Sequence, residues 1–187
     1  MSAPGPSGRE RAPTRNGAGA GSAADIVVRR ARQDDVPQIA AWNAQLIRDE
    51  QNDAGADADD VEPRLREWLA KDYVACVFEG MTLASLAAPR GGAVSPSGRP
   101  FGTDVPRAFG YAIFRELPDC VHLRHFFVEA AFRRRGYGRR AFERLREMFP
   151  RGKRILVEVL VWNAPGAAFW KSVGFEARYL GLQMSGD

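Results

Sequence analysis

The chain has 187 residues, of which 45% are hydrophobic and 27% charged, and this composition suits one globular domain with its own core. Two cysteines, Cys76 and Cys120, exclude a disulfide framework and favour a reducing, cytoplasmic compartment, and no apolar run approaches the ~18–20 residues of a membrane span. The net charge of +4 conceals two opposite segments, with nine acids and one base in 34–62 and ten bases and two acids in 132–154.

Residues 1–24 are dominated by Gly, Ala, Ser, Pro and Arg and contain no apolar stretch typical of a secretory signal. This composition predicts a disordered tail followed by a single domain over 25–187. Within that domain, residues 88–107 are rich in Gly, Pro and Ser and are predicted to form a long surface loop.

The first half of the domain reads as a strand, two helices and a strand. "IVVRRA" (26–31) has the pattern of a strand, and a helix is expected to begin near Asp34 or Asp35, with Pro37 in its first turn. A second short helix is predicted over 61–70, and "YVACVF" (73–78) is rich in β-forming residues.

The second half reads as a hairpin followed by alternating helices and strands. Strands are predicted over 109–114 and 121–128, and an amphipathic helix after Gly136. "RILVEVLVW" (154–162) resembles a buried strand, a short helix follows over 165–173, and "FEARYLGLQM" (175–184) is read as a last strand. The resulting order, βααββ(β)αβαβ, predicts a mixed α/β domain.

The stretch "FRRRGYGRRAFERLREMF" (132–149) has two interpretations. Between a strand and a helix, Gly136 and Gly138 allow close backbone approach, and the start of the helix directs N–H groups at one point, as a pyrophosphate requires. The alternative is a nucleic-acid patch over Arg133–Arg140, which needs exposed aromatic rings for stacking. The apolar residues of the helix belong to the core, so only Tyr137 would remain for that purpose.

Two motifs together indicate a family. "FFVEAAFRRRGYGRRAFERL" and "NAPGAAFWKSVGF" occur in the order and spacing of the GNAT acyltransferase superfamily, which the chain resembles from about Ile26 to Met184. The second motif matches loosely, because Ala167 lies one place late. The resemblance implies a GNAT fold: an α/β domain with a central, mixed, mostly antiparallel sheet that splays at the acetyl-CoA site and has helices on both faces.

The resemblance also implies acetyl-CoA as co-substrate. The turn at 134–139 would hold the pyrophosphate, the end of the preceding strand would pair with pantetheine, and Asn163 would hydrogen-bond the pantetheine arm. The implied acetyl-CoA residues are Phe126, Phe127, Val128, Arg133, Arg134, Arg135, Gly136, Tyr137, Gly138, Arg139, Asn163 and Trp170. Trp170 stands where many relatives have a tyrosine that protonates the departing thiolate, and an indole N–H does not serve that purpose.

The reaction that the resemblance implies is direct attack of an amine on the thioester, with an oxyanion stabilised near Val128. Candidate catalytic residues are Glu50, His122 and Arg124. Glu50 is either a base or a solvated helix end, and His122 is either a base or a half-solvated strand residue. Strand alternation predicts His122, Arg124 and Phe126 on one face, with His125, read as a packed residue, on the other.

The sequence is therefore interpreted as an N-acetyltransferase acting on a primary amine of a small molecule or amino acid. Acidic residues near Glu50 favour simple amines, whereas Arg124 favours an amine that also bears an acid. The competing interpretations are a catalytically weak acyl-CoA-binding regulatory module and, less favoured, a nucleic-acid-binding protein. No metal, nucleic acid or membrane partner is expected, and a homodimer is the assembly that the family resemblance suggests.

Overall fold

The computed structural model describes residues 26–50, 58–80, 106–182 and 184. The predicted tail (1–24) and nearly all of the predicted loop (88–107) lie outside the described residues. Five strands and four α-helices make up the described domain: β1 Val27–Arg30, α1 Val36–Asp49, α2 Ala58–Ala70, β2 Tyr73–Gly80, β3 Arg107–Glu116, β4 Cys120–Val128, α4 Tyr137–Glu147, β5 Arg154–Val157 and α5 Ala164–Ser172.

The strands form one mixed sheet in the order β1-β2-β3-β4-β5. The first four strands are antiparallel neighbours, and β5 lies parallel to β4, so the predicted mixed, mostly antiparallel sheet is confirmed. Because β5 pairs only with Cys120–Leu123, the second half of β4 continues without a partner on that side. We call the region bounded by 124–128 of β4 and 158–163 after β5 the fork.

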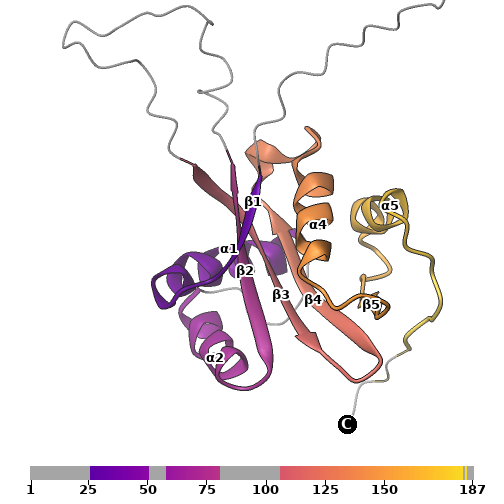
Figure 1. The fold of residues 1–187 in the computed structure, drawn as a ribbon, viewed down its shortest axis with the longest axis horizontal. Helices are drawn as coiled ribbons and strands as arrows, with labels where there is room; N and C mark the ends of the chain where they lie inside the picture. Colours follow the sequence, from indigo (N-terminus) through magenta and orange to yellow (C-terminus); the bar gives the residue numbers. More distant parts are fainter. Residues whose placement is uncertain (1–25, 51–57, 81–105, 183, 185–187) are drawn as a thin grey trace, which may run out of the picture.

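Helices cover both faces of the sheet, as predicted (Figure 1). α1 and α2 lie on one face, where a core cluster joins them to β2 and β3. α4 packs against the opposite face, and α5 adds partly buried rings to that second cluster. The amphipathic patterns of α1, α2 and α4 account for this arrangement, because an apolar stripe must be covered by the sheet.

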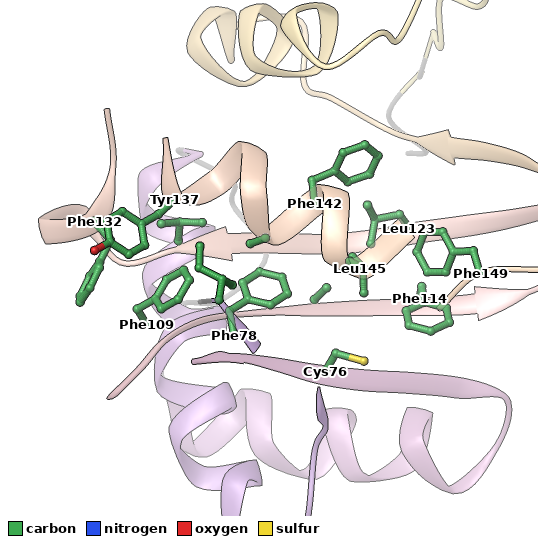
Figure 2. Packing of buried hydrophobic residues seen from close by; sticks show 14 of the residues in the cluster. Cys76, Phe78, Phe109, Phe114, Leu123, Phe132, Tyr137, Phe142, Leu145 and Phe149 are labelled. Carbon is green, nitrogen blue, oxygen red and sulfur yellow. The ribbon is translucent and has the colours of Figure 1, made fainter. Parts of the chain in front are cut away.

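The α4 face is held largely by aromatic packing (Figure 2). Phe109, Phe132 and Tyr137 form a three-ring group in which every pair of ring centroids lies 5.0–5.3 Å apart. Such pairs contribute about 0.5–1.5 kcal/mol each beyond the area they bury. Tyr137 is only 3% exposed. Its ring is therefore a core component, and the nucleic-acid interpretation loses the aromatic residue on which it depended.

Two strand predictions at the C-terminal end were wrong. The apolar run 154–162 forms a strand only over Arg154–Val157, and the described residues after Ser172 contain no strand. An apolar run needs neighbours on both sides to form a buried strand, but β5 has β4 as its single neighbour. Val161, Tyr179 and Leu182 are accordingly exposed, at 74%, 87% and 89%.

A β-bulge in β4 changes the predicted faces of that strand. The register with β3 shifts at Ile113/Phe114, so that Ile113 pairs with His125 and Phe114 with Leu123, which leaves Arg124 as the extra residue. Beyond the bulge the alternation is reversed. Arg124 and His125 both lie on the α1/α2 face, and Phe126 packs in the cluster on the α4 face. The prediction that Arg124 and Phe126 share a face was therefore wrong.

In the part of the chain that the structure describes, no helix combines the length and the apolar character needed to cross a bilayer.

Candidate active site

The fork exposes one backbone edge of β4. Glu129 N–H donates to Phe109 O across the β3 side at 2.8 Å. Because successive N–H and C=O groups point to opposite sides of a strand, those of Val128 point into the fork. The contact of Val128 O with Arg133 Nε at 2.6 Å agrees with this direction. The fork thus offers backbone groups to an extended ligand, as a further strand would.

The turn before α4 forms a concave group of backbone N–H donors. Arg134 has φ 59° and Gly136 has φ 80°, so two residues adopt the left-handed conformation in this turn. Gly136 caps α4, and Arg140 N–H reaches Gly136 O at 3.2 Å. The first turn of an α-helix has N–H groups without intrahelical acceptors and carries the positive end of the helix dipole. This geometry suits a pyrophosphate.

Gly138 allows the turn to approach both the fork and α5. A Cβ added at this position would lie 3.3 Å from Phe169 Cε2 and 3.8 Å from Val128 Cγ2. Glycine therefore favours close packing between three elements at this position. The exposed side chains of Arg134 and Arg135 add positive charge beside the same turn.

Two of the arginines predicted to bind acetyl-CoA contact protein groups in this structure. Arg133 forms an ion pair with Asp49 at 2.6 Å, and its guanidinium lies 5.2 Å from the ring centroid of Phe127. Arg139 donates to the carbonyl oxygen of Ser172. In this structure Arg133 links the fork to the end of α1, and Arg139 links α4 to the end of α5.

Glu50 lies directly after α1, beside Trp162 and Asn163, and we call this end of the fork its mouth. Its carbonyl oxygen accepts from Trp162 Nε1 at 2.8 Å, and its Oε1 accepts from Asn163 Nδ2 at 3.3 Å. Burial raises the pKa of the half-buried Glu50 carboxyl, the hydrogen bond from Asn163 opposes this effect, and the charge of Asp49 adds to it. A carboxyl with a raised pKa is well suited to take a proton near neutral pH.

Asn163 connects Glu50 to α5. Its Oδ1 accepts from Gly166 N–H at 2.9 Å and caps the helix, while its Nδ2 faces Glu50. A Cβ on Gly166 would lie 2.7 Å from Asn163 Nδ2, so glycine at this position is needed for the cap to form. The amide therefore has a fixed orientation at the mouth of the fork.

The three predicted catalytic residues do not all lie close together. His122 is opposite Leu156, within the part of β4 that pairs with β5, and its Nε2 lies 3.8 Å from Glu158 Oε2. Burial lowers the pKa of His122, and Arg115 and Arg124 lower it further, against the opposing effect of Glu158. Glu50 lies beside Asn163 at the mouth of the fork, whereas Arg124 is the first residue on the β4 side of the fork and its guanidinium lies over the Trp68 ring.

A polar cluster beneath α1 escaped the sequence interpretation. Asn43 Nδ2 lies 2.8 Å from His125 Nδ1, and Tyr111 Oη lies 3.5 Å from the same nitrogen. Burial, together with Arg124 and Arg64, lowers the pKa of His125 to about 3, so its ring is neutral and Nδ1 accepts from the amide. This confirms the packed role predicted for His125. The available signal was Asn43, a polar residue on the apolar stripe of a helix.

Trp170 belongs to an aromatic wall on the other side of the fork. Its ring centroid lies 5.3 Å from that of Phe126, 5.4 Å from Phe142, 4.9 Å from Phe169 and 5.0 Å from Phe175. Four ring neighbours indicate a packing role for Trp170, in line with the expectation that its indole N–H does not serve as the acid.

The comparisons with known proteins agree with this geometry. Residues 62–175, more than half of the chain, match the model of the acetyltransferase (GNAT) family. The chain therefore belongs to the GNAT acetyltransferase family, and the predicted class of enzyme, an acyltransferase that uses acetyl-CoA, is confirmed. No curated protein matches the sequence.

Several solved structures share the fold at low sequence identity. The aminoglycoside N-acetyltransferase AAC(6')-Iy in complex with CoA is 15% identical, with a TM-score of 0.57, and the match covers 87% of this chain and 95% of that one. A protein described as a possible acetyltransferase from Clostridium difficile 630 is 16% identical, with a TM-score of 0.58 and coverages of 87% and 98%. A ribosomal-protein-alanine N-acetyltransferase from Brucella melitensis biovar Abortus 2308 is 12% identical, with a TM-score of 0.58 and coverages of 86% and 99%.

Proposed function

We propose that the protein is an N-acetyltransferase that transfers the acetyl group of acetyl-CoA to a primary amine of a small molecule. The observation that carries the proposal is the position of Glu50, a carboxyl with a raised pKa, at the mouth of a fork whose opposite edge is the open backbone of β4. A base and an ordered edge of N–H donors are the two groups that acyl transfer to an amine requires.

The described residues fit acetyl-CoA. The left-handed turn at Gly136, the start of α4 and the nearby arginines suit its phosphates, and the open edge at Phe126–Val128 suits its extended arm. Asn163 presents an amide at the position where the two sides of the fork separate. When bound, acetyl-CoA supplies an activated acyl group on a good leaving group, because a thiol has a pKa of about 8.5.

The protein contributes proton transfer, orientation and charge stabilisation. The Glu50 carboxylate accepts the proton of the acceptor ammonium, and Asn163 Nδ2 holds that carboxylate in place. The Val128 N–H, which points into the fork, donates to the carbonyl oxygen that gains negative charge. Because Trp170 is packed among four rings, thiolate departure is expected to proceed without an acid from this residue.

Isothermal titration with acetyl-CoA tests the binding step, with Gly136→Trp as the disabling variant. Gly152→Trp is its matched control, because Gly152 has nearly the same conformation (φ 83° against 80°) and equally open surroundings. Binding is expected in the wild type and in Gly152→Trp and is expected to be lost in Gly136→Trp. Absence of binding by the wild type would contradict the proposal.

A thiol-release screen over amines then tests turnover. Release that depends on a primary amine supports the N-acetyltransferase. Tight binding of acetyl-CoA without turnover of any amine would favour the competing interpretation of a regulatory acyl-CoA-binding module. The observation that favours this second interpretation is Trp170, which stands where many relatives have the usual tyrosine.

A further inference from the structure

Three arginines surround two aromatic rings on the α1/α2 face of the sheet. Arg64 and Arg124 lie 5.4 and 4.4 Å from the ring centroid of Trp68, and Arg115 and Arg124 lie 5.3 and 5.9 Å from that of Tyr73. The two rings are themselves 5.6 Å apart. We call these five residues, contributed by α2, β2, β3 and β4, the arginine array.

Positive charge in the arginine array is poorly neutralised by the described residues. Arg115 has one acid in range, Asp72 at 3.8 Å, and no described acid forms an ion pair with Arg64 or Arg124. The Nε atoms of Arg64 and Arg115 are buried and have no hydrogen-bond partner among the described residues. The three guanidinium groups thus carry positive charge with few carboxylate partners among the described residues, and the exposed Arg124 makes this charge accessible to an anionic ligand.

The arginine array is connected to the candidate active site. Arg124 is the bulge residue and the first position of β4 beyond its last pair with β5. The ring of His125 lies 5.6 Å from that of Trp68, and its Nδ1 lies 3.5 Å from Tyr111 Oη. Burial raises the pKa of Tyr111, and the charge of Glu50 raises it further.

The distance between the reacting end of the site and the arginine array limits the length of a ligand that occupies both. Arg124 and Val128 are four residues apart along β4, about 13 Å at the usual rise of an extended strand. The amine and carboxylate of an α-amino acid share one carbon atom and do not span a distance of this kind. Arginine side chains shorten this backbone distance, so an amine that reacts near Val128 and an anion held by the arginine array correspond to a molecule in which several bonds separate the two groups.

We infer that the acceptor is an extended small molecule with a primary amine at one end and a carboxylate or phosphate at the other, the anionic end binding between Arg64, Arg115 and Arg124. This inference rests on the proposed function and names the class of acceptor for the same site. The amine end is the end that reacts, and the arginine array selects and orients the molecule.

A matched panel of amines tests the inference. The panel comprises ε-aminocaproate, its isomer norleucine, n-hexylamine, hexamethylenediamine and aminohexyl phosphate, each assayed with acetyl-CoA by thiol release. The kcat/KM for ε-aminocaproate or aminohexyl phosphate should exceed that for hexylamine by roughly tenfold to a hundredfold, the range of a charge-assisted hydrogen bond. Norleucine should show no such advantage, and the better of the two anionic amines identifies the anion.

Variants of Arg124 distinguish a role of the arginine array in ligand recognition from a purely structural role. Arg124→Gln should abolish most of the preference for ε-aminocaproate over hexylamine, and Arg124→Glu should turn it into a preference for hexamethylenediamine. Arg66→Gln is the control on the same helix, because Arg66 pairs with Glu62 on the exposed surface, and the preference should remain. A purely structural array would lose stability in these variants without an inversion of the preference.

The failures of the inference and of the proposed function are distinguishable. If hexylamine and ε-aminocaproate react equally well, or if the preference survives Arg124→Glu, the inference is overturned and the N-acetyltransferase stands. If no amine reacts, titration of ε-aminocaproate into the acetyl-CoA complex shows whether the anionic amine binds without reacting. Absence of binding overturns the inference. If acetyl-CoA itself does not bind, the proposed function fails and the inference fails with it.

Discussion

On the α4 face of the sheet, β4 contributes Val121, Leu123, Phe126 and Val128 to a cluster of aliphatic and aromatic side chains. On the α1/α2 face the same strand contributes His122, Arg124 and His125, whose neighbours are an acid, two aromatic rings and a buried amide. For β4 the α4 face is thus the apolar face and the α1/α2 face the polar face, although the buried Phe127 also lies on the latter and packs in the core cluster there. The bulge makes this separation sharper, because it places Arg124 and His125 on the same side.

The difference between the two faces divides the expected effects of substitution. Changes on the apolar face should alter the free energy of unfolding and leave the chemistry intact if the protein remains folded. Changes on the polar face should alter rates, acceptor choice or pH dependence more than stability. The following predictions test this division, beginning with the largest expected effect.

Glu50→Gln should lower kcat by roughly 100-fold to 10,000-fold, because the variant keeps the size of the side chain and an acceptor for Asn163 but removes the base. In the wild type, kcat/KM should rise with pH through the raised pKa of Glu50, since the carboxylate is the active form. Steady-state thiol release as a function of pH measures both effects.

Asp49→Asn is the matched control for Glu50→Gln. Asp49 precedes Glu50 and forms an ion pair with Arg133, and a partly exposed pair of this kind contributes only about 0–1 kcal/mol. A small change in kcat is therefore expected. An equal loss of activity in both variants would show that the charge of this segment matters and that Glu50 is not the specific base.

Gly110→Ala should lower the free energy of unfolding by about 3 kcal/mol, which lies in the upper part of the usual range for single substitutions. A Cβ at this position would lie 2.2 Å from Phe127 O, so the backbone that supports both faces of β4 would have to move. Urea unfolding monitored by circular dichroism measures the loss. Gly181→Ala is the control, because a Cβ there has open space around it, and a similar loss in both variants would contradict the explanation.

The two faces also differ in how well the sequence predicted them. The apolar periodicity after Gly136 predicted the amphipathic helix of the α4 face, the glycine spacing predicted the turn, and the family resemblance implied that the sheet splays at the fork. A pattern repeated every two or every 3.6 residues is a local property, so it can be read without knowledge of the fold.

The polar face was harder to predict because its features depend on tertiary contacts. The bulge at Arg124 follows from the register with β3, which a single strand does not reveal. The ion pair of Arg133 with Asp49 and the contact of Asn43 with His125 join residues far apart in the chain. The described residues after Ser172 form no strand although their local sequence favours one, and no described strand lies beside them.

Trp170→Ala should lower the free energy of unfolding by about 2 kcal/mol, less than a fully buried ring would lose, because Trp170 is only partly buried against Phe126 and Phe142. Trp170→Phe should retain most of the packing and leave kcat within a few-fold of the wild-type value. Thermal unfolding and thiol release on both variants test this pair of expectations. A large loss of kcat in a well-folded Trp170→Phe would show that the indole takes part in the reaction.

His125→Gln should change the pH dependence of stability more than stability at neutral pH. The pKa of His125 is about 3 in the folded protein and about 6.5 in the unfolded chain, so between these values the unfolded chain binds more protons. Wild-type stability should therefore fall as pH decreases from 6.5, by at most about 1.4 kcal/mol per pH unit from this residue. Urea unfolding between pH 6.5 and 5 measures the slope before most carboxylates titrate.

His122→Gln is the natural control, because His122 is the other histidine of the chain. It partly faces Glu158, whose charge opposes the lowering of the His122 pKa by burial. The slope should diminish in His125→Gln and persist in His122→Gln, and the reverse result would identify His122, in the part of β4 that pairs with β5, as the buried neutral histidine.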